Sequence, residues 1–212
     1  MDGLLLDTER IHLQCFSDSC RMHDLVPDIQ AIHACIGTTW QRTREILEDA
    51  YGGAFRWDSV RAEWQKLYHQ RVKESPAPVK TGALGLLLML SDLCIPCIVI
   101  TSSSHADAIS HLSRANLAEY FVDVVGGDQV KTGKPHPEPY LEGLRRLKAN
   151  ATNCWALEDS KNGVLSALAA GLQVFQVPDI VPPDERVEET NYTLCKSLYD
   201  VMDLVQGIDD ER

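Results

Sequence analysis

The sequence predicts an α/β protein in which helices cover a parallel sheet and an all-helical domain is inserted near the N-terminus. After residue 76, short apolar segments alternate with segments of helical spacing. Fully apolar strands that alternate with helices are typical of parallel sheets buried on both faces. Residues 9–75 show helical spacing without such strands. We therefore predict a Rossmann-like core of residues 1–8 and 76–212, with residues 9–75 as the inserted helical domain.

The inserted segment is predicted to form several helices. Apolar side chains recur at helical spacing from Ile11 onward, and the pattern is interrupted at Pro27, Gly37 and the Gly52-Gly53 pair. Residues 57–72 form a further amphipathic pattern. These helices are predicted to form a bundle or to cover another part of the molecule.

The core is predicted from four repeats of a helix followed by a strand. Parallel strands place their carboxyl ends at one edge of the sheet, where ligands of such folds bind. The predicted helices are 82–93, 105–116, 137–148 and 162–171, and the predicted strands are 97–101, 122–126, 154–157 and 173–177.

Composition and charge narrow the class of partner. The net charge is -11 and no basic patch offsets it, which argues against a nucleic acid or an anionic membrane as partner but not against a small anionic substrate. The most apolar stretch, residues 83–90, is too short to span a bilayer. Seven cysteines at irregular spacing suggest a reducing compartment. We expect a cytosolic monomer.

Two polar motifs follow the first predicted strand ends. Asp2-Gly3 puts a carboxylate, which can exchange protons with a phosphoester oxygen, beside a glycine; it also fits an ordinary turn. The run Thr101-Ser102-Ser103-Ser104 ends a strand and opens a helix, an arrangement that suits an anion. The same run is also explained by a serine that caps the helix and binds no ligand.

Two further motifs follow later strands. Lys134 lies between Gly133 and Pro135, where a rigid backbone could hold its amine against a phosphoryl oxygen; the alternative is a solvated loop lysine. Glu158 and Asp159 are hard oxygen donors of the kind that Mg²⁺ prefers, although Asp159 could instead cap the following helix.

Taken together, these motifs resemble the haloacid dehalogenase-like hydrolase superfamily over almost the whole chain. The resemblance is carried by the motifs at residues 2–9, 133–138 and 157–163 and by the closing segment 169–179. The subgroup with a helical cap domain after the first motif fits best; it includes beta-phosphoglucomutase, sugar-phosphate phosphatases and pseudouridine 5′-phosphatase. The resemblance implies an enzyme that uses Mg²⁺ to hydrolyse a small phosphomonoester, a sugar phosphate or a nucleotide-like molecule.

The resemblance also implies a role for each matching residue. In that family a first Asp attacks phosphorus to form an aspartyl phosphate, and a second Asp, matched by Asp2, protonates the leaving oxygen and then activates water. Thr101 and Lys134 would act on the transferring phosphoryl group. The implied site comprises the catalytic residues Asp2, Thr101 and Lys134, the metal-binding residues Asp2, Glu158 and Asp159, and the substrate-binding residues Ser102, Ser103, His12, Gly37, Thr38, Thr39 and Trp40.

One part of the family pattern has no match. Met1 stands immediately before Asp2, so the first Asp and the central strand that carries it would lie upstream of residue 1. Asp7 lies five residues past Asp2 and is a poor substitute. We expect the 212-residue chain to be poorly folded and inactive, with an internal Met taken as its start.

Three functions remain open at this stage. The cap loop Gly37-Thr38-Thr39-Trp40 is expected to set substrate selectivity. Mutases of the subgroup carry an Arg in this loop and a Lys after the strand-end hydroxyls, where this chain has Trp40 and Ser104, so a phosphatase is favoured. Arg42 could serve as an alternative anion-binding residue, so a mutase remains possible. Without its nucleophile, the chain could also be a non-catalytic binder of phosphorylated metabolites.

Overall fold

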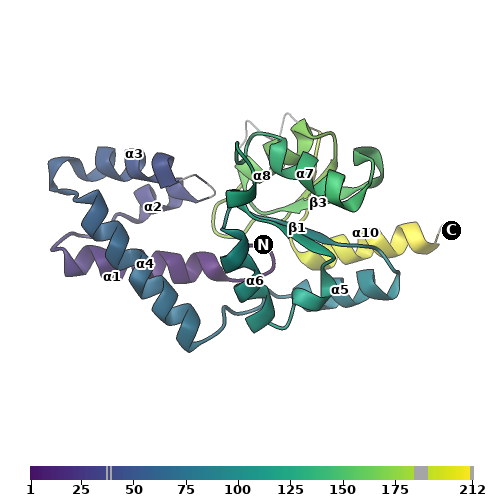
Figure 1. The fold of residues 1–212 in the computed structure, drawn as a ribbon, viewed down its shortest axis with the longest axis horizontal. Helices are drawn as coiled ribbons and strands as arrows, with labels where there is room; N and C mark the ends of the chain where they lie inside the picture. Colours follow the sequence, from purple (N-terminus) through teal and green to yellow (C-terminus); the bar gives the residue numbers. More distant parts are fainter. Residues whose placement is uncertain (37, 39, 184–190, 211–212) are drawn as a thin grey trace.

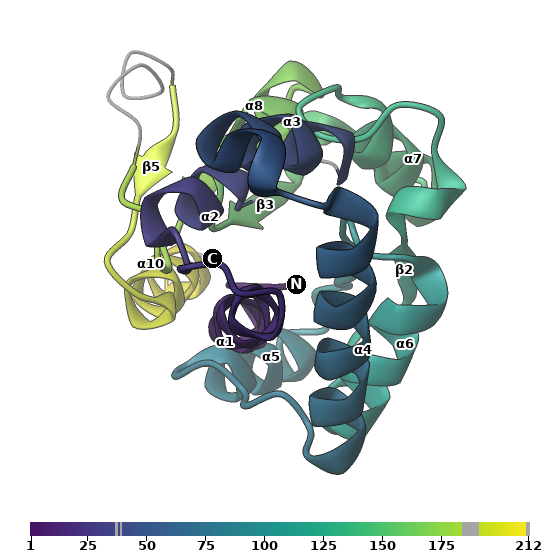
Figure 2. The same cartoon turned by 90° about the vertical axis from the view of Figure 1, so that its left-hand side faces the viewer.

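A computed structural model describes residues 1–36, 38, 40–183 and 191–210. The first part of the chain is helical and forms one lobe of the molecule (Figure 1). Seen from the side of this lobe, α1 is viewed end-on and α4 runs beside it along one flank, and the two helices pack against each other (Figure 2). The elements of this lobe are α1 (Thr8–Met22), α2 (Ile29–Cys35), α3 (Trp40–Tyr51), the 3-10 turn η1 (Gly52–Ala54) and α4 (Trp57–Glu74).

The second lobe alternates helices with strands, as expected for an α/β core. Helix α7 packs against β1 and β2, α8 against β3 and β4, and α5 against α10. The helices are α5 (Ala83–Asp92), α6 (His105–Arg114), α7 (Glu138–Leu147), α8 (Lys161–Ala169) and α10 (Leu198–Asp210), with 3-10 turns η2 (Ala118–Tyr120), η3 (Gly127–Gln129) and η4 (Ala151–Asn153). The strands are β1 (Ile98–Ile100), β2 (Asp123–Val125), β3 (Trp155–Glu158), β4 (Gln173–Gln176) and β5 (Thr193–Leu194).

All strand pairs are parallel, which confirms the predicted class of sheet. In the described residues they form two separate sheets, β1-β2 and β3-β4-β5. The strands β1 and β3 therefore each have a partner along one edge only. The register places Ile98 opposite Asp123, Trp155 opposite Gln173 and Phe175 opposite Thr193.

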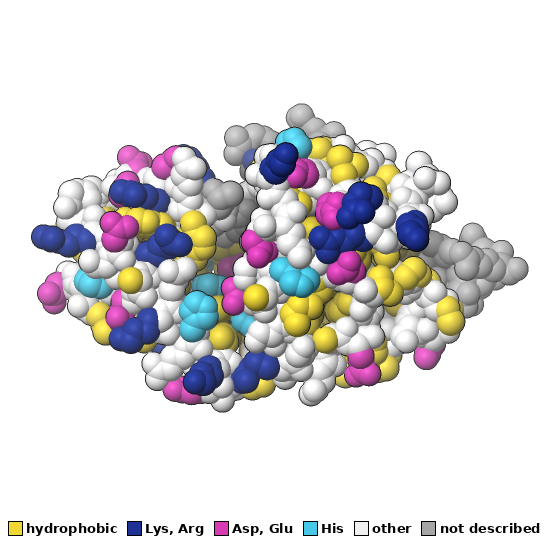
Figure 3. Space-filling model, in the orientation of Figure 1, with side chains coloured by type: hydrophobic (Ala, Val, Ile, Leu, Met, Phe, Trp, Pro, Cys, Tyr) yellow, Lys and Arg dark blue, Asp and Glu magenta, His cyan; other side chains and the backbone are white. Residues whose placement is uncertain are grey.

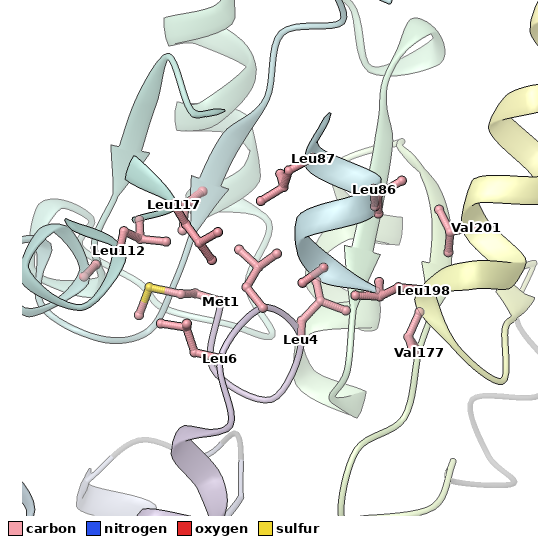
Figure 4. Packing of buried hydrophobic residues seen from close by; sticks show 14 of the residues in the cluster. Met1, Leu4, Leu6, Leu86, Leu87, Leu112, Leu117, Val177, Leu198 and Val201 are labelled. Carbon is pink, nitrogen blue, oxygen red and sulfur yellow. The ribbon is translucent and has the colours of Figure 1, made fainter. Parts of the chain in front are cut away.

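Residues of the N-terminal motif are part of the main hydrophobic core. Met1, Leu4 and Leu6 lie among side chains of α5, α6 and α10 (Figure 4). Leu6 is fully buried, and burial of a leucine side chain contributes roughly 1.5–3 kcal/mol to stability. This packing fixes the backbone of Asp2 and Gly3, which lie between these apolar residues. Gly3 has φ of 71°, a conformation that favours glycine.

The helical lobe has a hydrophobic core of its own, built around Phe16 of α1 and Val60, Trp64 and Tyr68 of α4. Two chain crossings connect it to the second lobe, one before α1 and one after α4. At the crossings, the amide of Asp7 donates to the carbonyl of Pro78 at 2.8 Å. The amide of Lys80 donates to the carbonyl of Leu5 at 2.9 Å.

A buried carboxylate joins both crossings. Asp179 lies on the loop after β4; its side chain is only 3% exposed and forms ion pairs with Arg10 of α1 and with Lys80. Arg10 also pairs with Asp7 at 2.7 Å. The helical lobe is thus tied to the core beside the Asp2 motif.

The elements differ from expectation mainly at their ends. The core strands begin or end within one or two residues of the predicted bounds, and the sequence pattern did not reveal β5 or α10. In the described part of the chain, no helix combines the length and apolar character that crossing a bilayer requires.

Candidate active site

A cleft of about 590 Å³ lies between the helical lobe and the carboxyl ends of the core strands. It is visible as the hollow between the two lobes, where histidine side chains gather (Figure 3). Gly37 and Thr39 lie outside the described residues. The other predicted site residues all line this cleft: Asp2, His12, Thr38, Trp40, Thr101, Ser102, Ser103, Lys134, Glu158 and Asp159.

Three hydroxyl groups hold the carboxylate of Asp2. Thr8 Oγ1 donates to Oδ1 at 2.8 Å, while Thr101 Oγ1 and Ser103 Oγ donate to Oδ2 at 3.2 and 3.0 Å. Burial raises the pKa of Asp2, but the chain's amino group and the hydrogen bonds from Thr8 and Ser103 outweigh it, so that the pKa is lowered. Asp2 is therefore held as an oriented carboxylate.

Ser103 and Ser104 make different contacts in the structure, and the cap explanation applies to Ser104. Ser104 caps α6, because its side chain accepts a hydrogen bond from the amide of Asp107 at 3.2 Å. Ser103 instead turns its hydroxyl toward Asp2, and its amide donates to Thr101 Oγ1 at 3.1 Å. Thr101 and Ser103 therefore share the strand end with Asp2.

Lys134 is a buried cation and not a solvated loop residue. Its side chain is 9% exposed and pairs with Glu158, whose side chain is 6% exposed. Lys134 Nζ also donates to the carbonyl of Ile100, at the end of β1, at 3.1 Å. Tyr140 of α7 donates its hydroxyl hydrogen bond to the same oxygen of Glu158. Lys134 thereby bridges the ends of β1 and β3.

Asp159 lies beside the Lys134–Glu158 ion pair but is not part of it. In the described residues, no other side chain forms a hydrogen bond or ion pair with its carboxyl group. Burial and the neighbouring charge of Glu158 raise its pKa to about 7, although the positive charges of the chain's amino group and of Lys134 partly oppose this rise. A Cβ added at Gly3 would overlap this carboxyl group, and one at Gly163 would overlap that of Glu158. The two glycines therefore leave room for the acidic pair.

The donor set suits Mg²⁺ in its chemistry. Glu158 and Asp159 supply hard carboxylate oxygens, and the raised pKa of Asp159 is the kind of cost that a cation would remove. Within the described residues, no three His, Cys, Asp or Glu side chains are grouped to hold a metal unaided. Because Mg²⁺ usually keeps several waters and binds substrate phosphate, two protein carboxylates are compatible with it.

The helical lobe contributes an aromatic wall. The ring of His12 stacks on Tyr68, with centroids 3.8 Å apart, and Trp64 lies edge-on to His12 at 6.0 Å. Burial lowers the pKa of His12 to about 4, so this ring is neutral at pH 7. Trp40 extends the wall, with its ring centroid 5.2 Å from that of Trp64.

Comparison with known proteins places the chain in a family. The model of the haloacid dehalogenase-like hydrolase family matches residues 1–177. The chain belongs to this family. It is therefore a hydrolase by family, and the membership agrees with the resemblance that its motifs indicated.

Several members of the haloacid dehalogenase-like family are similar over most of the chain. A phosphorylated carbohydrates phosphatase of Thermotoga maritima is 31% identical over 178 residues, which cover 82% of this chain and 80% of the relative. A fructose-1-phosphate phosphatase of Escherichia coli is 31% identical over 186 residues, covering 84% and 93%.

Solved structures share the fold. A beta-phosphoglucomutase of Clostridium difficile has a TM-score of 0.79 at 19% identity, with 99% of this chain and 95% of that chain covered. CbbY of Rhodobacter sphaeroides, in complex with phosphate, has a TM-score of 0.75 at 22% identity, with 93% and 92% covered.

Sequence reasoning missed several residues of the site in this family member. Thr8 and Tyr140 lie within or beside the quoted motifs, so their spacing could have indicated a role. Trp64 was recognised only as part of an apolar helix face, and Tyr68 was not singled out. Glu9 also lines the cleft, although nothing in the sequence pattern marked it as a site residue.

Proposed function

We propose that this family member is a Mg²⁺-dependent phosphatase of small phosphomonoesters. One observation supports this most strongly: Lys134, Thr101, Asp2 and the pair Glu158–Asp159 come from separate segments of the chain and line one cleft. Such a cleft offers a cation, hydroxyl donors and carboxylates to one phosphoryl group. The names of the two similar phosphatases, which refer to phosphorylated carbohydrates and to fructose 1-phosphate, favour a sugar phosphate as substrate.

Asp159, with Glu158 beside it, is proposed to hold the magnesium ion. Bound there, Mg²⁺ offsets the negative charge of the phosphoryl group and so favours approach of a nucleophile. Lys134 is held next to these carboxylates by the carbonyl of Ile100 and by Glu158, so its amine is oriented before substrate binds. The amine then pairs with a phosphoryl oxygen as charge develops there.

Asp2 is proposed to move the protons. As a carboxylate oriented by Thr8, Thr101 and Ser103, it accepts a proton from the attacking water; in its protonated form it gives one to the leaving oxygen. The reaction is proposed to pass through an aspartyl phosphate on the residue two positions before Asp2. That position is not among the 212 residues.

The test compares three polypeptides for phosphate release in the presence of Mg²⁺. One is the 212-residue chain; the second carries an N-terminal extension, an apolar strand that ends in Asp two residues before Asp2; the third has Asn at that position. We expect release only from the second. Comparable rates from all three would refute the proposed nucleophile, and no release from any would refute the phosphatase assignment.

A mutase is the second candidate, because the fold is shared with a beta-phosphoglucomutase. The two reactions differ in product, since a phosphatase releases inorganic phosphate and a mutase converts one sugar phosphate to its isomer. Measurement of both products from glucose 1-phosphate separates them. If the extended chain binds a phosphoester but forms neither product, it is a non-catalytic binder of phosphorylated metabolites.

A further inference from the structure

The amine of Lys134 is held by two acceptors and lines the cleft. An ammonium group carries three N–H donors. Within the described residues, Nζ of Lys134 donates to the carbonyl of Ile100, at 3.1 Å, and to Oε1 of Glu158. The third N–H is left for a phosphoryl oxygen, and its direction depends on how firmly the other two contacts hold the amine.

The backbone on both sides of Lys134 is fixed by neighbouring hydrogen bonds. Each carboxylate oxygen of Glu138 accepts from one amide of the loop before Lys134, at 2.8 and 3.0 Å. After Lys134, the hydroxyl of the fully buried Ser166 donates to the carbonyl of His136 at 2.6 Å. These bonds place the start of the lysine side chain. The orientation of its far end depends on the groups around the amine.

Tyr140, in the first turn of α7, contacts both members of the Lys134–Glu158 ion pair. Its hydroxyl donates to Oε1 of Glu158, the same oxygen that accepts from Lys134. The hydroxyl is the donor, because a carboxylate oxygen only accepts. Nζ of Lys134 also lies 5.3 Å from the centroid of the Tyr140 ring, which is within the range of a cation–π interaction.

Tyr140 makes these contacts from behind the cleft. It is 7% exposed and packs in a hydrophobic cluster with Ile100, Val125 and Val164. The described residues that line the cleft include its neighbour Pro139 but not Tyr140 itself. The ring is therefore a rigid part of the core that reaches the charged groups of the site without facing the substrate.

We propose that Tyr140 is a positioning residue that orients the amine of Lys134 toward the phosphoryl group. Its hydroxyl fixes the carboxylate oxygen with which Lys134 pairs, and its ring attracts the ammonium. This inference rests on the proposed function, because it assumes that Lys134 acts on the transferring phosphoryl group. Without the hydroxyl the carboxylate of Glu158 is free to turn, so the amine keeps its charge but loses its alignment, which lowers the rate.

The test measures phosphate release from fructose 1-phosphate by the extended chain in Mg²⁺, with rates expressed per folded molecule from circular dichroism. Tyr140→Phe keeps the ring and removes the hydroxyl. We expect kcat to fall about tenfold, ~1.4 kcal/mol of transition-state stabilisation, with KM within about twofold of the wild type. Tyr140→Leu also removes the ring and is expected to lower kcat by about tenfold more.

A second background separates positioning from support of the fold. On Lys134→Met, Tyr140→Phe should change kcat by less than about twofold, because the amine that it orients is gone. Lys134→Gln serves as the background if Lys134→Met does not fold. Tyr199→Phe makes the same chemical change at a 53% exposed position of α10 and is the control, with kcat within about twofold of the wild type.

Each outcome supports or overturns the inference. A tenfold loss that disappears without Lys134 supports positioning through the amine. An equal loss with and without Lys134 would show that Tyr140 supports only the fold, and an unchanged kcat in Tyr140→Phe would show that its hydroxyl has no role. In both cases the phosphatase assignment stands. If the extended wild type releases no phosphate, the proposed function and the inference fail together.

Discussion

Glu9 lies in the first turn of α1 and lines the cleft close to other acids. Burial of its carboxyl group, reinforced by the charges of Asp2, Asp159 and Asp179, raises its pKa from 4.5 to about 8. A raised pKa means that the native state holds the proton more tightly than the unfolded chain does. Ionisation of this one residue therefore lowers the stability of the native protein as the pH rises.

The magnitude of this effect follows from the pH interval. Between its ordinary pKa and pH 7, an interval of about 2.5 pH units, the carboxyl group of Glu9 is ionised in the unfolded chain but still protonated in the native protein. This difference lowers the free energy of unfolding at pH 7 by about 3 kcal/mol. Glu9→Gln keeps the shape and removes the ionisation. We expect the variant to have a free energy of unfolding about 2–3 kcal/mol above that of the wild type at pH 7. The gain should vanish near pH 4.5 and level off above pH 8.

Urea denaturation at pH 4.5, 7 and 8.5 measures the gain. The exposed Glu74 on α4 provides the control, because Glu74→Gln should change stability by less than about 0.5 kcal/mol at each pH. Magnesium should reduce the gain, since a cation near Asp159 counteracts the neighbouring charges. A gain that is equal at pH 4.5 and 8.5, or a loss at pH 8.5, would show that the carboxyl of Glu9 is solvated.

Three further predictions concern the acidic pair. Lys134→Met leaves Glu158 buried without its cation, so urea denaturation should show a free energy of unfolding lower by about 3–5 kcal/mol. Phosphate release by the extended chain should fall at least about 100-fold. Unchanged stability would mean that the Lys134–Glu158 ion pair is weak. Gly163→Ala should destabilise the protein because a Cβ there overlaps Glu158, whereas Gly207→Ala, with open space around it in α10, should stabilise it by about 0.5–1 kcal/mol. Mg²⁺ should raise the melting temperature of the wild type but not of Asp159→Asn, and an equal rise in both would place the metal elsewhere.

The sequence was informative where structure follows local pattern. Alternation of apolar strands and helices predicted the parallel sheet because strands buried on both faces must be apolar throughout. The motif at Lys134 was predicted to lie at the site because two nearby prolines restrict its backbone. Strand β5 is only two residues long, so it carries too little periodicity to be recognised.

Other parts of the site depend on contacts between distant residues. Tyr140 reaches Glu158 across 18 positions, and Trp64 meets His12 only when α1 and α4 pack together. Helical periodicity predicts which face of α4 is buried, but it does not show that one end of that face lines a cleft. The sequence likewise left open which of Ser103 and Ser104 caps α6, because either serine can cap a helix.

The paired chain crossings beside Asp179 make the helical lobe a replaceable module. Its two ends meet where backbone hydrogen bonds join residues 5–7 to residues 78–80, and its apolar side chains are buried within itself. A short turn spliced after Thr8 would keep the hydrogen bonds that Thr8, Thr101 and Ser103 donate to Asp2. Substrate selectivity could then be changed by grafting a different helical lobe, while the residues at the strand ends keep their geometry.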